Sequence, residues 1–325
     1  MKNILITGVS GYLGTCLVRK LKQKHPNGEI AGIDIHPPPD DIAEKISFYR
    51  KDIRDPEIGK VMTRHHIDTV LHLAFVVKPI HNLKQMRDID ENGTQNILEQ
   101  SLAAGVDHLI AVSSTLAYGA HPDNPKRLAE AHPLRGNPSF PYGFYKAETD
   151  RMIQAFANDH PAMAVTILRP CTVFGPNIDN YVSRMLFLPV TICIKGHNPM
   201  VQFVHETDFV NACLAALEKK MPGAFNIAGD GTLTIRQIAK LLGTRLMPLP
   251  AWLVYPMLEF LWKLHFPMIE VNRGYLDYIR YPFVVSNKKA KKELNFTPRF
   301  SSATTLRDTL RSRPHAQSKP KPAPR

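Results

Sequence analysis

Short apolar runs recur along the first half of the chain, and most of them are rich in β-branched residues. Each run is bounded by polar, glycine or proline residues, which is typical of a buried strand. We therefore expect strands over residues 3–7, 29–34, 46–50, 69–74 and 107–113.

The stretches between these runs have apolar residues at helical spacing. Residues 12–24 place Leu13, Leu17 and Leu21 on one face of a helix. A long helix is expected over 82–104, a second helix begins near Tyr142, and a third spans 206–219. Strands that alternate with helices predict an α/β fold with a doubly wound parallel sheet.

The regular alternation weakens after residue 170. We therefore expect a first domain over 1–170, joined by returning elements near 203–228, and a smaller C-terminal substrate-binding lobe that accounts for most of 171–311. Residues 286–311 predict two short helices. The stretch 312–325 is polar, proline-rich and basic, and it predicts a disordered tail.

Charge is distributed unevenly along the 325 residues. Residues 286–325 hold eleven Lys and Arg but only two acids, so they carry nine of the twelve net positive charges. A basic tail can contact nucleic acid or an anionic membrane, but a solvated tail is the commoner case, and no nucleic-acid partner is expected.

Cysteine and histidine spacing predicts no metal site. The four cysteines are far apart, and His65, His66 and His205 lack a third ligand at suitable spacing. The N-terminal apolar run is too short for a signal peptide, and no apolar run reaches the roughly 18–20 residues of a membrane span. These features predict reduced thiols and a cytoplasmic location.

A glycine-rich turn follows the first predicted strand directly. Gly8, Gly11 and Gly14 recur at a spacing of three. Such glycines allow a sharp turn, the approach of a pyrophosphate and close packing of the next helix, whose N-terminus attracts an anion. Three glycines alone can mark only a turn, but their place after a strand favours a phosphate cradle.

Other candidate ligands stand at the ends of the predicted strands. Asp34 ends the second strand, where a carboxylate accepts hydrogen bonds from a ribose diol and repels a 2′-phosphate. This favours NAD over NADP. Ala74 and Ser113 follow two further strands, and ligands of parallel sheets bind at these carboxyl ends.

Tyr142 and Lys146 are four residues apart at a predicted helix start, so they share one face. A nearby ammonium lowers the pKa of a tyrosine, which is near 10 when unperturbed. We expect Tyr142 to exchange a proton with a substrate hydroxyl and Ser114 to bind the same oxygen. Tyr-x-x-x-Lys alone usually marks a helix surface; the glycine turn and the strand-end serine favour catalysis.

These motifs together resemble the extended short-chain dehydrogenases/reductases of the NAD-dependent epimerase/dehydratase group. The matching stretches are Thr7 to Gly14, Asp34, His72 to Ala74, Gly93-Thr94 with Asn96, Val112 to Ser114, Tyr118-Gly119, Tyr142 to Lys146, Leu168 to Pro170, Phe174 to Pro176, Phe203 to His205 with Asp208, and Phe225 to Gly229. The resemblance covers residues 1 to about 310 and is specific for the family, not for a substrate.

The resemblance implies a Rossmann-type fold that binds NAD and a catalytic triad of Ser114, Tyr142 and Lys146. Lys146 would also hold the nicotinamide ribose. We assign the cofactor contacts to Gly8, Gly11, Tyr12, Leu13, Gly14, Asp34, Asp52, Ile53, Leu73, Ala74, Ser113, Tyr142, Lys146 and Pro170.

The sequence departs from the family at three places. Asp90 stands where many members have Asn, and we interpret it as a structural substitute. Thr115 and Leu116 replace the acidic pair of the 4,6-dehydratases, so elimination of water is not expected. Gln202 and Val201 precede Phe203 where many nucleotide-sugar enzymes have Arg, which binds diphosphates bidentately. Three other cations could supply the charge: Arg184, Lys195 and Arg236.

Residues 249–268 form the most apolar stretch, rich in aromatic residues and interrupted by Pro250, Pro256 and Pro267. We expect these prolines to prevent one long helix. A pair of short helices closing the core is the simplest interpretation. A lid over an apolar substrate, or a peripheral membrane contact, is the alternative.

Two substrate classes follow for an NAD-dependent oxidoreductase. One is an apolar alcohol or ketone, such as a sterol-like compound, that is oxidised or reduced; the other is a nucleotide sugar that is epimerised on tightly held NAD. A non-catalytic NAD-binding regulatory protein is the third hypothesis. The expected partner is a small-molecule substrate, and a homodimer is left open.

Overall fold

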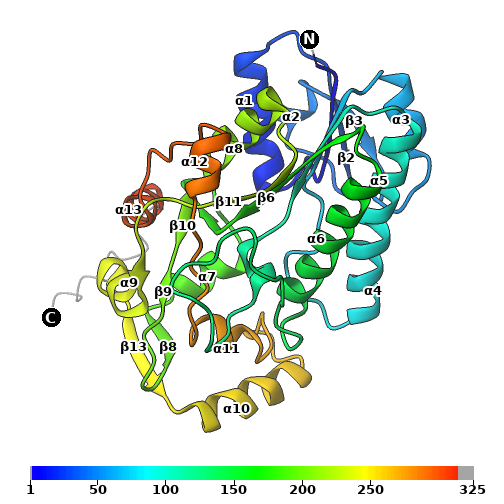
Figure 1. Cartoon of the computed structure of the whole chain (residues 1–325). Helices are drawn as coiled ribbons and strands as arrows, with labels where there is room; N and C mark the ends of the chain where they lie inside the picture. Colours follow the sequence, from blue (N-terminus) through cyan, green and yellow to red (C-terminus); the bar gives the residue numbers. More distant parts are fainter. Residues whose placement is uncertain (1, 314–325) are drawn as a thin grey trace, which may run out of the picture.

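A seven-stranded parallel sheet forms the centre of residues 2–313, the part of the chain that this computed structural model describes (Figure 1). Its strand order is β11-β6-β5-β4-β1-β2-β3. The strands are β1 (Ile4–Thr7), β2 (Ile30–Asp34), β3 (Ser47–Arg50), β4 (Thr69–His72), β5 (His108–Val112), β6 (Ala164–Pro170) and β11 (Gly223–Ile227). The predicted Rossmann-type doubly wound sheet is confirmed.

Helices cover both faces of this sheet (Figure 1). One face carries α1 (Tyr12–Lys24), α2 (Asp40–Ala43) and α8 (Glu206–Lys219). The other face carries α3 (Ile58–Arg64), α5 (Gly93–Ala103) and α6 (Pro141–Asp159). The bounds predicted for α1 and α8 coincide with the observed ones, because both helices have a continuous apolar face.

The predicted helix over 82–104 is interrupted by one wider turn. It consists of α4 (Leu83–Arg87), a π-helical turn (Asp88–Asn92) and α5. A π turn is wider than an α-helical turn, so it changes the direction in which its side chains point. Such turns are frequent at functional sites. Here it carries the fully buried Asp90.

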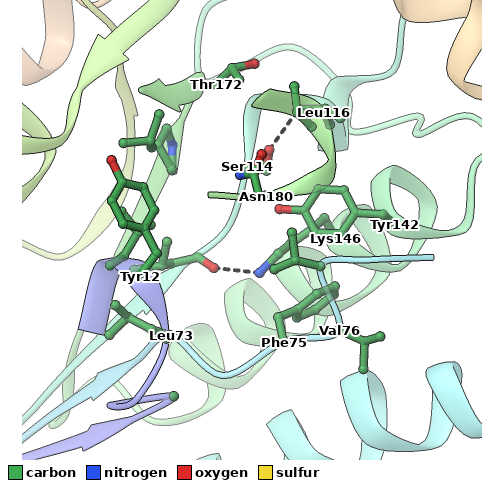
Figure 2. A pocket seen from close by; sticks show the side chains of 18 of the residues that line it. Tyr12, Leu73, Phe75, Val76, Ser114, Leu116, Tyr142, Lys146, Thr172 and Asn180 are labelled. Atoms are coloured by element: carbon green, nitrogen blue, oxygen red, sulfur yellow. Dashed lines mark hydrogen bonds between the residues drawn. The ribbon is translucent and has the colours of Figure 1, made fainter. Parts of the chain in front are cut away.

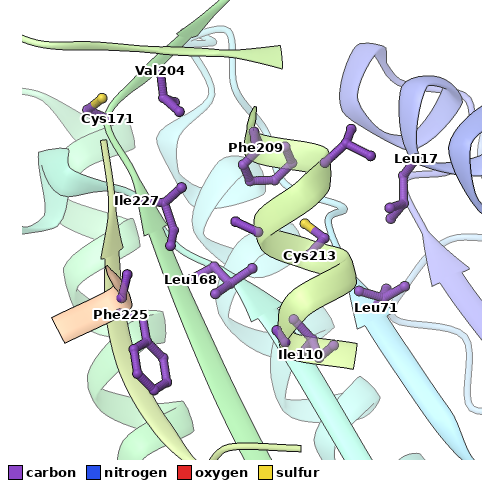
Figure 3. Close-up of a cluster of buried hydrophobic side chains, with 14 of the residues drawn as sticks. Leu17, Leu71, Ile110, Leu168, Cys171, Val204, Phe209, Cys213, Phe225 and Ile227 are labelled. Carbon is purple, nitrogen blue, oxygen red and sulfur yellow. The ribbon is translucent and has the colours of Figure 1, made fainter. Parts of the chain in front are cut away.

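α8 explains why the chain returns to the sheet after residue 203. Its Phe209 and Cys213 pack against Leu168 of β6 and Ile227 of β11 (Figure 3). Leu17 of α1 belongs to the same buried cluster. Burial of these side chains stabilises the sheet by roughly 1.5–3 kcal/mol for each large apolar residue.

Short elements make up the rest of the described chain. They are the 3-10 helix Thr115–Tyr118, β7 (Thr172–Phe174), α7 (Tyr181–Leu186), β8 (Val190–Ile194), β9 (Met200–Val201), β10 (Phe203–His205), β12 (Leu233–Thr234), α9 (Ile235–Leu242), β13 (Arg245–Leu249), α10 (Ala251–Lys263), α11 (Tyr275–Tyr278), α12 (Lys288–Glu293) and α13 (Ser302–Ser312). The two helices expected within 286–311 are α12 and α13. Ser312, expected to begin the tail, ends α13, and residues 314–325 lie outside the described residues.

α10 corrects the prediction that prolines divide the stretch 249–268. One helix runs through Pro256, which removes only the hydrogen bond to the carbonyl of Trp252. Trp252 and Pro256 are both exposed, so water can hydrate that carbonyl. No helix within residues 2–313 is long and apolar enough to cross a membrane.

Candidate functional site

A cavity of about 610 Å³ opens at the carboxyl ends of the central strands. Every residue that the sequence assigned to the cofactor or to catalysis lies in its wall. The structure thus brings together residues at or just after the ends of β1, β2, β4, β5 and β6 and at the start of α6, which the sequence could only place at strand and helix ends. Among residues 2–313 no group of three His, Cys, Asp or Glu side chains could hold a metal ion.

The glycine-rich turn is closely packed. Gly8 has a positive φ of 72°, and a Cβ on it would lie 2.8 Å from the backbone nitrogen of Ala74. A Cβ on Gly14 would lie 2.4 Å from the carbonyl oxygen of Gly8. Gly11 precedes α1 and provides no side-chain cap, so the first N–H groups of this helix can bind an anion. The turn fits a pyrophosphate.

Asp34 is held at the edge of this turn. Its carboxylate accepts hydrogen bonds from the backbone N–H groups of Ser10 and His36, both at 3.1 Å. This leaves a fixed negative charge in the cavity wall, which suits a ribose diol and opposes a phosphate. Asp52 is engaged by Arg54 at 2.6 Å, and this contact lowers the pKa of the Asp52 carboxyl.

Ser114, Tyr142 and Lys146 point into the same cavity (Figure 2). Ser114 follows β5, and its hydroxyl oxygen accepts a hydrogen bond from the N–H of Leu116 at 3.1 Å. Tyr142 and Lys146 lie in the first turns of α6, which begins at Pro141. Pro suits this position because it lacks the N–H that a first turn leaves unpaired.

Lys146 contacts an aromatic ring that the sequence analysis did not single out. Its ammonium lies 3.5 Å from the centre of the Phe75 ring and donates a hydrogen bond of 2.7 Å to the carbonyl of Val112. The Phe75 ring in turn meets Tyr142 edge-on, with 5.7 Å between the ring centres. Phe75 directly follows Ala74, which the sequence analysis assigned to the cofactor. Its position near the end of a strand was the signal that could have identified it as a site residue.

The expected fall in the pKa of Tyr142 does not occur in this structure. Burial raises the pKa of Tyr142 to about 12, a hydrogen bond with Ser114 lowers it, and the charge of Asp90 raises it. The Lys146 ammonium is directed to Phe75 and Val112 instead. The prediction was wrong because sequence spacing shows a shared face and cannot show where the ammonium points.

Asp90 lies close enough to this group to affect its charge. One carboxylate oxygen accepts a hydrogen bond of 2.8 Å from the N–H of Val76, and within the described residues the other oxygen is buried without a partner. Burial raises the pKa of Asp90 to about 7, and Lys146 lowers it. Burial lowers the pKa of Lys146, and Asp90 raises it. The two groups therefore support each other's charged form.

Replacing Asp90 with Asn is expected to stabilise the protein increasingly as pH rises. The raised pKa means that wild-type stability is fully present below about pH 4 and declines until about pH 7, whereas the amide does not ionise. The difference in unfolding free energy should grow by on the order of 2 kcal/mol between about pH 5 and about pH 8. Urea unfolding of Asp90→Asn and wild type at both pH values measures it; a constant difference would contradict it.

The far side of the cavity is apolar and aromatic. It is formed mainly by Leu116, Cys171, Val173, Tyr181, Val182, Leu186, Val201, Phe203, Ile235, Ile238, Tyr275, Tyr278, Ile279 and Phe283, and it also includes the polar Thr172 and Asn180. Most come from the segments after Pro170, where the regular pattern of apolar residues is weak and predicted no site residue. No residue of 249–268 is in the wall, so the lid interpretation of that stretch is not supported.

The three cations that could replace the missing Arg are not in this wall. Arg184 forms ion pairs with Glu270 at 2.7 Å and Asp179 at 3.3 Å. Lys195 and Arg236 border a separate cavity of about 180 Å³. Of the described residues, only Lys51 and Lys146 bring a Lys or Arg to the main cavity, and Lys146 lies against Phe75 and Val112.

Comparison with known proteins finds similarity over most of the chain. The profile of the NAD dependent epimerase/dehydratase family matches residues 4–228. An uncharacterized protein of Mycobacterium tuberculosis is 28% identical over 320 residues, covering 96% of this chain and 84% of its own length. The UDP-glucose 4-epimerase of Neisseria meningitidis is 27% identical over 269 residues, covering 72% of this chain and 77% of its own length.

Solved structures show the same fold. The UDP-glucose 4-epimerase of Thermotoga maritima, solved with UDP-glucose, superposes with a TM-score of 0.73 at 23% identity, covering 95% of this chain and 98% of the other. The dTDP-glucose 4,6-dehydratase of Bacillus anthracis, solved with NAD, gives a TM-score of 0.75 at 19% identity and covers 96% of each chain.

Proposed function

Because the chain belongs to the NAD-dependent epimerase/dehydratase family, whose cofactor is NAD, we propose that it oxidises or reduces an apolar secondary alcohol or ketone. A sterol-like or other hydrophobic compound is the substrate class. The glycine turn and Asp34 would hold the pyrophosphate and the adenosine ribose, and Lys146 the nicotinamide ribose. NAD, when bound, accepts or returns the hydride.

The residues of the site would handle the proton. A pKa of about 12 keeps the Tyr142 hydroxyl protonated at neutral pH, so it is ready to donate a proton to the oxygen of a ketone. In the reverse direction, Tyr142 would first release its proton to water, and the phenolate would then take the proton of the alcohol hydroxyl. Ser114 would hydrogen-bond the same oxygen and fix its distance from the tyrosine.

The single observation that carries the choice of substrate is the composition of the far wall. Lys and Arg side chains commonly hold a substrate diphosphate, and within residues 2–313 this wall presents none. Ligand cavities are usually apolar with a few polar groups that orient the ligand. Here the hydroxyls of Tyr181, Tyr275 and Tyr278, with the side chains of Thr172 and Asn180, are the polar groups among apolar side chains.

A substrate panel tests this proposal. Purified protein is mixed with NAD⁺ and cyclic apolar alcohols, and NADH formation is followed by absorbance. We expect turnover on at least one apolar alcohol and none on UDP-glucose. The Tyr142→Phe variant is the control for background oxidation. No turnover on any apolar alcohol, together with epimerisation of UDP-glucose, would overturn the substrate class.

A nucleotide-sugar epimerase is the second candidate function. It is favoured by the similarity to the UDP-glucose 4-epimerase of Neisseria meningitidis. Such an enzyme would interconvert UDP-glucose and UDP-galactose without net formation of NADH and would retain NAD through purification. Release of NAD on denaturation of the purified protein, with no exchange beforehand, would favour this candidate.

A further inference from the structure

One face of α10 exposes a continuous group of apolar side chains. We call Trp252, Leu253, Met257, Phe260 and Leu264 the α10 face. Trp252 is 77% exposed, Phe260 63% and Leu264 61%. Phe266 and Met268 extend the exposed apolar surface beyond the helix. Single exposed apolar residues are common, but a contiguous group of large ones marks an interaction site.

The opposite face of the same helix is already packed. Val254 is buried against Ile194 and Leu276, and Leu258 adds to this cluster. The helix is therefore apolar on both sides, while only one side is covered by the described chain. A helix that is apolar on all sides is normally buried. The α10 face is exposed to water instead, so we expect a further apolar surface to cover it.

The charges beside this face are arranged with the cations outward. Lys263 is 72% exposed, while its partner Glu259 is 28% exposed. Arg273, which pairs with the same glutamate, is 55% exposed. Lys78 is 61% exposed, while its partner Glu270 is 20% exposed. The acids are thus turned inward, and the surface beside the α10 face is positive.

We propose that the α10 face docks on an anionic phospholipid surface. Trp252 and Phe260 enter the headgroup region, and Lys78, Lys263 and Arg273 meet the phosphates. Aromatic residues flanked by Lys and Arg are typical of helices that lie in a membrane interface. A second copy of the chain fits less well, because a two-fold pair would bring the same cations face to face.

Docking in this way would bring the cavity close to the lipid. The segment at α11 separates the two, because Tyr275, Tyr278 and Ile279 line the cavity while Leu276 and Ile279 pack under α10. An apolar substrate dissolved in the lipid would then be near its site. This last step rests on the proposed function, whereas the docking itself does not.

Vesicle binding of the full chain tests the docking without any measurement of activity. Vesicles of equal parts phosphatidylcholine and phosphatidylglycerol are sedimented with wild type and with Trp252→Ser/Phe260→Ser. We expect wild type to bind and the double variant to bind at least about tenfold more weakly, because two large side chains no longer leave water. Lys263→Gln should weaken binding about fivefold.

Matched controls separate docking from unfolding. Leu102→Ser removes an exposed apolar side chain away from the α10 face, 41% exposed on α5, and should bind like wild type. The variants change exposed positions, so their urea unfolding midpoints should match that of wild type.

Three results would overturn the proposal. The first is no binding of wild type to the mixed vesicles, and the second is equal binding to phosphatidylcholine alone. The third is a wild-type dimer that the double variant converts to a monomer with unchanged vesicle binding, since this would assign the face to a second copy. None of these results bears on turnover of the substrate panel.

Discussion

Replacing Tyr142 with Phe is expected to lower turnover by about 10²–10⁴-fold, the usual contribution of a positioned acid/base group. The ring remains packed edge-on against Phe75, so only the hydroxyl is lost. Binding of NAD should change by less than about threefold, since Tyr142 loses only its hydroxyl and the other assigned cofactor contacts are untouched. Steady-state rates and fluorescence titration with NADH measure the two effects.

Tyr145→Phe is the matched control in the same helix. Its hydroxyl donates a long hydrogen bond of 3.4 Å to the carbonyl of Leu83 and does not line the cavity. This variant should retain wild-type rates. If wild type showed no turnover and Tyr142→Phe kept the NAD-dependent role of the protein, the non-catalytic hypothesis would replace the enzymatic one.

Replacing Arg169 with Met is expected to lower the free energy of unfolding by about 3–5 kcal/mol, because it leaves a buried carboxylate without its partner. Arg169 is 1% exposed and Asp150 is fully buried, and the two side chains form two hydrogen bonds of 2.8 Å. The guanidinium also donates to the hydroxyl of Tyr118 at 2.8 Å. Urea unfolding measures the loss.

Arg19→Met provides the contrast. Arg19 makes a similar paired contact with Asp41, but both side chains are more than 40% exposed. Exposed pairs contribute about 0–1 kcal/mol, so this variant should be nearly neutral. Adding Asp150→Asn to Arg169→Met should restore part of the loss. Equal effects of Arg169→Met and Arg19→Met would contradict the prediction.

The first half of the fold could be predicted because each element has a local signal. Buried parallel strands are continuous apolar runs, and α1 and α8 have an apolar stripe of the expected period. The π turn at Asp90 has no such signal, because it depends on how the helix fits against the sheet. The prediction for α10 was wrong for the opposite reason. Pro256 is a local signal for a helix break, but water can hydrate the carbonyl that it leaves unpaired, so the helix continues.

The features of the site also divide into those that the sequence predicts and those that depend on packing. Strand ends of one parallel sheet meet at one edge, so the positions of Gly8, Asp34 and Ser114 followed from the order of the elements. The direction of the Lys146 side chain depends on Phe75, and the aromatic wall depends on α11. These are packing relations between segments far apart in the chain, and no spacing rule encodes them.

The path of the chain after Pro170 affects how substrate preference can change. The chain leaves the sheet, returns for α8 and β11, and leaves again, so the side proposed to bind the substrate consists of two separate insertions. A graft that exchanges 171–202 and 229–285 with a relative would leave the pairing of β6 with β11 intact. A single cut at Pro170 would instead expose the edge of β6 and invite aggregation. Exchanging both insertions with those of a relative therefore requires two junctions before the returning elements α8 and β11 and two junctions after them.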